Sequence, residues 1–120
     1  MNKTKFTSKE LQLFSRIINK QLKSEKKQLK SAKKMLTDQR QFMQSSDLNR
    51  NEHVLGMRNV KMLKRLKNKS QKRVQKLQRA KDRIEDKTYG ICKKTGNMIS
   101  KQRLYVIPEA RFSVAKKYLI

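Results

Sequence analysis

The stretch that decides the fold is residues 11–43, LQLFSRIINKQLKSEKKQLKSAKKMLTDQRQFM. Its apolar residues recur at steps of three and four, the spacing of one helix face that packs against another helix. The positions of this seam are Leu11, Phe14, Ile18, Leu22, Glu25, Leu29, Ala32, Leu36, Gln39 and Met43. Just before them, Thr7 and Glu10 have the spacing of a capping box. The sequence therefore predicts a helix from about residue 8 to residue 43.

A second stretch predicts the partner of this helix. Residues 44–50 are rich in turn-favouring residues, and Asn49 with Glu52 can cap a following helix. That helix is expected from about residue 51 to residue 87, with Gly56 loosening its first turns. Its apolar stripe consists of Val60, Leu63, Leu66, Ser70, Val74, Leu77, Ala80 and Ile84.

The two stripes have a common register if the helices fold back on each other. Residue numbers paired across an antiparallel seam must then sum to a nearly constant value. The pairs that satisfy this are Leu11 with Ile84, Ile18 with Leu77, Leu22 with Val74, Ala32 with Leu63, and Leu36 with Val60. The same register places Glu25 opposite Ser70 and close to Lys69 and Arg73, which supply the cation that a carboxylate in an apolar seam needs. The expected fold is mainly α, a long antiparallel two-helix coiled-coil hairpin over residues 1–87 with a small C-terminal module over residues 88–120.

The charge of the chain points to a polyanionic partner. It has 33 Lys and Arg residues against 9 Asp and Glu residues, a formal net charge of +24 in 120 residues. From His53 to Lys81 there are eleven basic residues and no acid, so the Glu–Lys pairs that usually stabilise an exposed helix cannot form there. A solvated basic face is the alternative, but repulsion along the whole stretch favours relief by bound phosphates.

The basic residues form stripes along both predicted helices. We predict RNA contacts at Lys20, Lys23, Lys27, Lys30, Lys34, Arg58, Arg65, Lys69, Lys72, Lys76, Arg79 and Arg83. The stripes lack interleaved aromatic residues, and the chain shows no helix-turn-helix pattern. Contacts to the backbone and shape of folded RNA are therefore expected, rather than readout of a DNA groove.

Several classes of protein are disfavoured. Hydrophobic residues make up 35% of the chain, which suffices for a seam and a small cluster but not for a large enzyme core. His53 is the single histidine and has no constellation of nucleophile or metal ligands, so we expect no enzyme and no cofactor. No signal peptide and no run long enough to span a bilayer is apparent, which suggests a cytoplasmic protein.

The C-terminal part carries a family resemblance. The segments Arg83-Ile84-Glu85, Tyr89-Gly90-Ile91-Cys92, Thr95-Gly96, Arg103-Leu104 and Pro108-Glu109-Ala110 resemble the zinc-finger end of the DksA/TraR family. The preceding hairpin matches that family too. The resemblance implies a finger with four ligand positions, which fall on Cys92, Thr95, Ser113 and Lys116 in this sequence.

Only one of these four positions holds a cysteine, and a single thiolate cannot build a tetrahedral zinc site. We therefore expect a degenerate, zinc-less finger with no metal, and a short terminal helix from Ser113. Cys92 is then a small buried residue. The expected apolar cluster of this module is Ile91, Met98, Ile99, Leu104, Val106, Ile107, Phe112, Val114, Tyr118 and Leu119.

Three functions remain open on the sequence. The first hypothesis is a structural, ribosome-bound protein whose partners are ribosomal RNA and neighbouring ribosomal proteins. The family resemblance implies instead a regulator that enters the secondary channel of RNA polymerase and presents acidic residues at the hairpin tip. Asp47 is the lone acid of the predicted tip, and the high positive charge departs from the family pattern. The third hypothesis is a sequence-blind compactor of nucleic acid.

Overall fold

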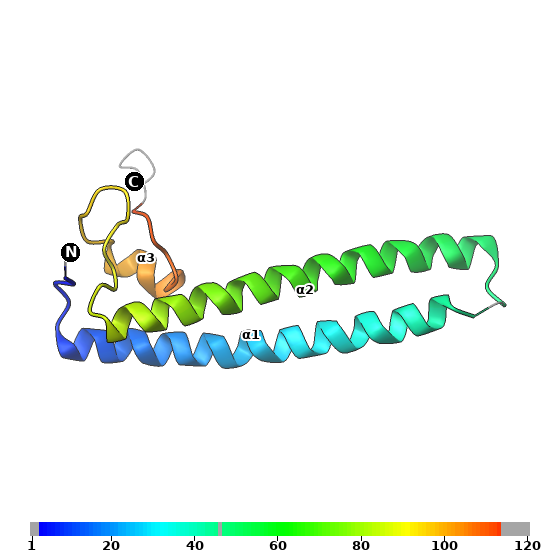
Figure 1. The fold of residues 1–120 in the computed structure, drawn as a ribbon, viewed down its shortest axis with the longest axis horizontal. Helices are drawn as coiled ribbons and strands as arrows, with labels where there is room; N and C mark the ends of the chain where they lie inside the picture. Colours follow the sequence, from blue (N-terminus) through cyan, green and yellow to red (C-terminus); the bar gives the residue numbers. More distant parts are fainter. Residues whose placement is uncertain (1–2, 46, 114–120) are drawn as a thin grey trace. The chain divides into compact units, whose positions relative to one another are not determined.

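Two long helices dominate the computed structural model, which describes residues 3–45 and 47–113 (Figure 1). Helix α1 spans Ser8–Met43, helix α2 spans Arg50–Glu85, and a short helix α3 spans Lys101–Val106. The two long helices pack as a hairpin, and the described residues contain one isolated antiparallel bridge, Ile91 with Met98, but no strand. The predicted fold class is confirmed.

The ends of the long helices follow local chemistry. Thr7 and Glu10 exchange two hydrogen bonds, because each side chain accepts from the other residue's backbone N–H, at 3.0 and 3.2 Å. The Asn49 side chain accepts from the backbone N–H of Glu52 at 2.8 Å. Both predicted caps are confirmed.

Helix α2 ends at Glu85, two residues before the predicted end at residue 87. Lys87 has a φ of 59°, in the left-handed region, and the Thr88 N–H donates to the Arg83 carbonyl at 2.9 Å. This is a Schellman termination with Lys where Gly is usual, so no glycine marks the end in the sequence.

The chain forms two compact units. The arm unit is Lys23–Val74, and the base unit combines Met1–Leu22 with Gln75–Ile120. The base unit therefore contains the first part of α1, the last part of α2 and the C-terminal module. The division into domains at residue 87 stays a prediction.

The arm unit is held by a narrow seam. Ala32, Leu36 and Leu63 are buried, and Glu25 is buried with Arg73, whose guanidinium lies 3.3 Å from its carboxylate. The expected cation is therefore present. Leu66, which was predicted in the apolar stripe, is 49% exposed. That placement was wrong, because a two-helix hairpin covers only a narrow face of each helix.

Gly56, which was predicted to loosen the first turns of α2, lies within the continuous helix in the arm unit. Gly56 is buried within α2, and a Cβ at this position would collide with the Met43 sulfur. The glycine thus provides room for the side chain at the end of α1.

The base unit has an aromatic core that the sequence analysis missed. The rings of Phe6 and Phe14 have centroids 5.2 Å apart, and Tyr89 lies 5.3 Å from Phe14. The Tyr89 hydroxyl donates to the Pro108 carbonyl at 2.8 Å, and both residues are buried. Gly90 has a φ of +82° and packs against the Phe6 ring, where a Cβ would clash. The N-terminal segment is thereby part of the core.

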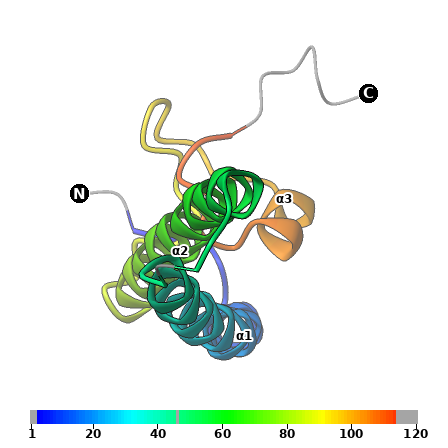
Figure 2. The ribbon, with the colours of Figure 1, turned by 90° about the vertical axis from the view of Figure 1, so that its right-hand side faces the viewer.

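The C-terminal module differs in detail from the expected cluster. Ile99 and Leu104 are buried as predicted, whereas Val106 is 72% and Phe112 50% exposed. Ile107 is exposed as well. Helix α3 was not predicted; it lies beside the end of α2 (Figures 1 and 2), capped by the Ser100 side chain. The expected terminal helix from Ser113, and with it Val114, Lys116, Tyr118 and Leu119, falls outside the described residues except for Ser113 itself.

Candidate nucleic-acid interface

The predicted basic stripe of α1 is at the surface. Its five members share one helix face because they recur at steps of three and four, and each is exposed: Lys20, Lys23, Lys27, Lys30 and Lys34. The seam uses other positions of the helix, so no packing contact has to be broken for these ammonium groups to meet phosphates.

The stripe of α2 is exposed with one exception. Arg58, Arg65, Lys69, Lys72, Lys76 and Arg79 are exposed, whereas Arg83 is half-buried. Arg83 donates to the Glu109 carbonyl at 3.4 Å, and burial together with the nearby Arg111 lowers its pKa. Arg83 is therefore a half-buried cation with a contact inside the base unit, and its assignment as an RNA contact stays a prediction.

Two acids form ion pairs with cations that lie outside the stripes. Glu25 pairs with Arg73 in the arm unit, and Glu10 pairs with Lys101 in the base unit. The Glu10 pKa is lowered by its hydrogen bond with Lys101, so this carboxylate stays charged. Neither cation belongs to a stripe, and the arm unit as a whole holds sixteen basic and four acidic residues.

The tip offers little for metal-directed chemistry. Asp47 is exposed, and its backbone N–H donates to the Ser45 hydroxyl at 3.3 Å. The next carboxylates along the chain are Asp38 and Glu52, both on helices. Among the described residues, no group of three or more His, Cys, Asp or Glu side chains comes together as a metal site would require.

Three of the degenerate ligand positions meet in the base unit. The buried Cys92 thiol accepts hydrogen bonds from the Ser113 N–H at 3.3 Å and from the Ser113 hydroxyl at 3.4 Å. Hydrogen bonds from Ser113 and Thr95 lower the pKa of the Cys92 thiol to about 6. Hydrogen bonds thus connect three of the four predicted ligand positions, while Lys116 lies outside the described residues.

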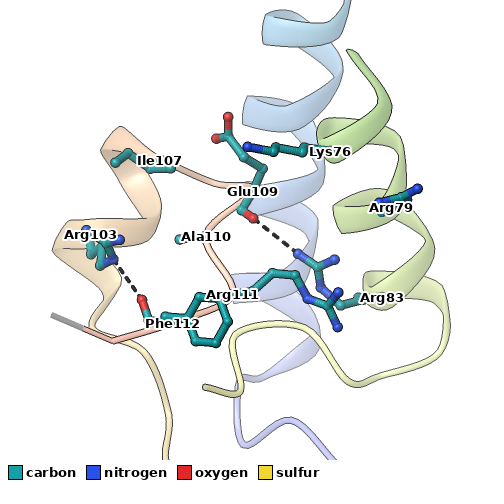
Figure 3. Close-up of a pocket in the computed structure, with 9 residues that line it drawn as sticks. All are labelled: Lys76, Arg79, Arg83, Arg103, Ile107, Glu109, Ala110, Arg111 and Phe112. Carbon is teal, nitrogen blue, oxygen red and sulfur yellow. Dashed lines mark hydrogen bonds between the residues drawn. The ribbon is translucent and has the colours of Figure 1, made fainter. Parts of the chain in front are cut away.

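A cavity of about 330 Å³ lies in the base unit (Figure 3). It is lined by Lys76, Arg79, Arg83, Arg103, Ile107, Glu109, Ala110, Arg111 and Phe112. The Arg103 side chain donates to the Phe112 carbonyl at 2.9 Å. Sequence analysis missed Arg103 and Arg111, because they lie outside the long helices and no periodic pattern connects them to α2.

A solved structure has the same fold as this chain. It is the transcription factor DksA2 from Pseudomonas aeruginosa, with a TM-score of 0.78 and 21% sequence identity over 88% of this chain and 78% of that chain. The chain has a DksA-like fold. Neither the protein-family models nor the curated proteins include a match to the sequence.

The DksA-like fold confirms the structural part of the resemblance seen in the sequence. At this identity the likeness describes the fold and not the activity. In the described part of the chain, no helix combines the length and the apolar character needed to cross a membrane.

Proposed function

We propose that this chain binds structured RNA through the basic faces of its helical hairpin, and that the partner is ribosomal RNA. The observation that carries the proposal is the acid-free segment from His53 to Lys81, with its eleven basic residues. In helix α2 the cations of this segment are exposed apart from Lys67 and Arg73, which are half-buried.

Electrostatic repulsion supports this proposal. Like charges three or four residues apart on a helix destabilise it by about 0.2–0.5 kcal/mol per pair, and α2 contains several such pairs. Bound phosphates remove this cost and release counterions, so the free energy of binding grows with the number of neutralised phosphates. A polyanionic partner therefore stabilises a chain with a net charge of +24 more than solvent does.

The absence of aromatic residues from the basic stripes favours folded RNA over single strands. Single-strand binders place aromatic side chains along the basic groove, whereas neither stripe contains an aromatic residue. Double-stranded RNA is recognised largely by backbone and shape contacts, which exposed Lys and Arg side chains provide. Ribosomal RNA offers many such helices close together. The proposal therefore includes neighbouring ribosomal proteins as partners and a ribosome-bound location.

The second candidate is a transcription regulator that acts on RNA polymerase. The DksA-like fold supports this candidate, and the comparisons favour it over a ribosomal role, since the matching structure is a transcription factor. The charge favours the ribosomal candidate, and the tip carries Asp47 without a second acid between Asp38 and Glu52. One experiment separates the two candidates.

The experiment is crosslinking in cells that make the protein at its natural level, followed by sequencing of the bound nucleic acid. Ribosomal RNA fragments clustered at a few positions, together with co-sedimentation with one ribosomal subunit, are the expected result. Polymerase subunits with nascent transcripts would instead establish the second candidate. Uniform recovery of chromosomal DNA would point to the compactor and refute both.

We further propose that the C-terminal module is a finger closed without zinc. The hydrogen bonds that Ser113 and Thr95 make with Cys92 support this proposal, because they connect positions that metal ligands would occupy. Elemental analysis of the purified chain tests it. We expect a zinc content far below one ion per chain. We also expect a midpoint of thermal unfolding that a chelator does not change.

A further inference from the structure

The cavity of the base unit combines positive charge with an apolar wall. Two guanidinium groups come from α2 and its end, Arg79 and Arg83, and two come from the C-terminal module, Arg103 and Arg111. Together with Lys76 they outnumber the single lining carboxylate, that of Glu109. A site of this composition attracts an anion.

Two of the guanidinium groups are held in place by hydrogen bonds to the backbone. Arg83 donates to the Glu109 carbonyl and Arg103 to the Phe112 carbonyl, as the dashed lines of Figure 3 mark. Arg111 lies near enough to Arg83 to lower its pKa, and Figure 3 draws both side chains reaching the same part of the cavity. Two guanidinium groups that repel each other are stabilised by an anion between them, and the planar fork of Arg suits phosphate.

The apolar wall offers a surface for a flat ring. Phe112 is 50% exposed although it is large and apolar, and Ile107, another residue that lines the cavity, is 38% exposed. Ala110, which also lines the cavity, has a small side chain that leaves room above the backbone. An exposed aromatic ring next to paired arginines is the arrangement by which proteins hold an unstacked nucleotide.

We propose that this cavity holds one unstacked nucleotide of the bound RNA, with its phosphate at Arg83 and Arg111 and its base on Phe112. The inference rests on the proposed RNA binding and adds a specific site to it. The cavity volume of about 330 Å³ lies at the small end of the range for ligand sites, which suits a single nucleotide. The stripes then provide affinity along duplex RNA, and the base unit selects a place where one nucleotide bulges out.

The test compares two RNA duplexes that differ by one unpaired nucleotide. One is fully paired, and the other carries a single 2-aminopurine bulge, whose fluorescence falls when the base stacks. The full chain is expected to bind the bulged duplex between about 5-fold and about 150-fold more tightly, the range of base stacking on an aromatic side chain. Binding should also quench the bulge fluorescence.

Variants connect this preference to the cavity. Phe112→Ala should abolish the preference and the quenching, Phe112→Tyr should retain both, and Arg111→Gln should reduce the preference. Lys94→Gln is the matched control, because Lys94 is exposed in the same module and does not line the cavity. It should lower binding of both duplexes equally.

The outcomes distinguish this inference from the proposed function. Equal binding of both duplexes by the unaltered chain would overturn the nucleotide site and leave duplex binding intact. No binding of either duplex would overturn the proposed function itself. Saturable binding of free adenosine monophosphate, with no preference for the bulge, would show a site for a free nucleotide and would also overturn the inference.

Discussion

Neutralising three cations of the α2 stripe should weaken RNA binding and make the free protein more stable. Lys69, Lys72 and Lys76 are exposed and lie three and four residues apart on one helix. Changing all three to Gln lowers the net charge from +24 to +21, and Gln has nearly the helix propensity of Lys. The triple variant therefore removes charge without disturbing the helix.

The magnitude follows from the number of contacts. If each ammonium group meets one phosphate, the slope of log K against log salt concentration should fall by about 2 to 3, at about 0.9 per phosphate. At one salt concentration the loss should be about 1 to 3 kcal/mol, since exposed ion pairs contribute up to about 1 kcal/mol each. Fluorescence anisotropy with a labelled structured RNA, repeated over a salt series, measures both quantities.

The same change should raise the free energy of unfolding of the unbound chain. The variant removes repulsion between neighbouring stripe cations, each pair of which costs about 0.2–0.5 kcal/mol. Urea unfolding followed by circular dichroism is the measurement. An increase in stability together with weaker binding is the signature of residues placed for a partner.

A second triple variant separates arrangement from total charge. Lys3, Lys5 and Lys9 are exposed and lie outside the stripes, and changing them to Gln also lowers the net charge to +21 from +24. This control should change the salt slope by much less. Equal slopes for the two triple variants, or an unchanged slope for the α2 variant, would refute the role assigned to the stripe.

Three further predictions concern stability and the finger. Tyr89→Phe should lower the free energy of unfolding by about 1–3 kcal/mol, because it leaves a buried carbonyl without its hydroxyl donor; urea unfolding measures it. Arg73→Met should destabilise the chain by leaving the buried Glu25 carboxylate without that cation, and adding Glu25→Leu should restore most of the loss, as a double-variant cycle can show. The thiolate absorbance of Cys92 should titrate near pH 6, with Ser113→Ala moving the midpoint upward.

The Cys92 prediction has a defined sign in stability. The pKa of this thiol is lowered on folding, from an ordinary value of 9.0 to about 6. The stabilisation is therefore complete above pH 9 and is lost as the pH falls towards 6. Stability that is independent of pH over this window, in comparison with a Cys92→Ala variant, would contradict the hydrogen-bonded thiolate.

The long helices could be predicted because their determinants are local or periodic. The seam spacing, the Thr7–Glu10 box and the Asn49 cap act within a few residues, and each is present in the structure. The antiparallel register needed only one further assumption, a turn near residue 47. This register predicts a cation close to Glu25, and in the structure that cation is Arg73.

The candidate site was only partly predictable. The exposed stripes follow from the helical period, since the residues that do not face the seam face solvent. Arg83 has the same spacing, but its side chain donates to the Glu109 carbonyl. These two residues are far apart in the sequence, so the helical period does not predict their contact. Helix α3 is six residues long, too short for a periodic signal to identify.

By itself, the sequence determined the two helices, their register and the positions of the charge stripes, because these depend on spacing along one chain. Only the tertiary structure decided which residues form the base unit. Tyr89 is buried against Phe14 with its hydroxyl donating to the Pro108 carbonyl, and Arg111 lines a cavity with Arg83 because the module folds back on α2. Contacts between distant segments depend on how the irregular parts of the chain pack. Neither composition nor periodicity specifies that packing.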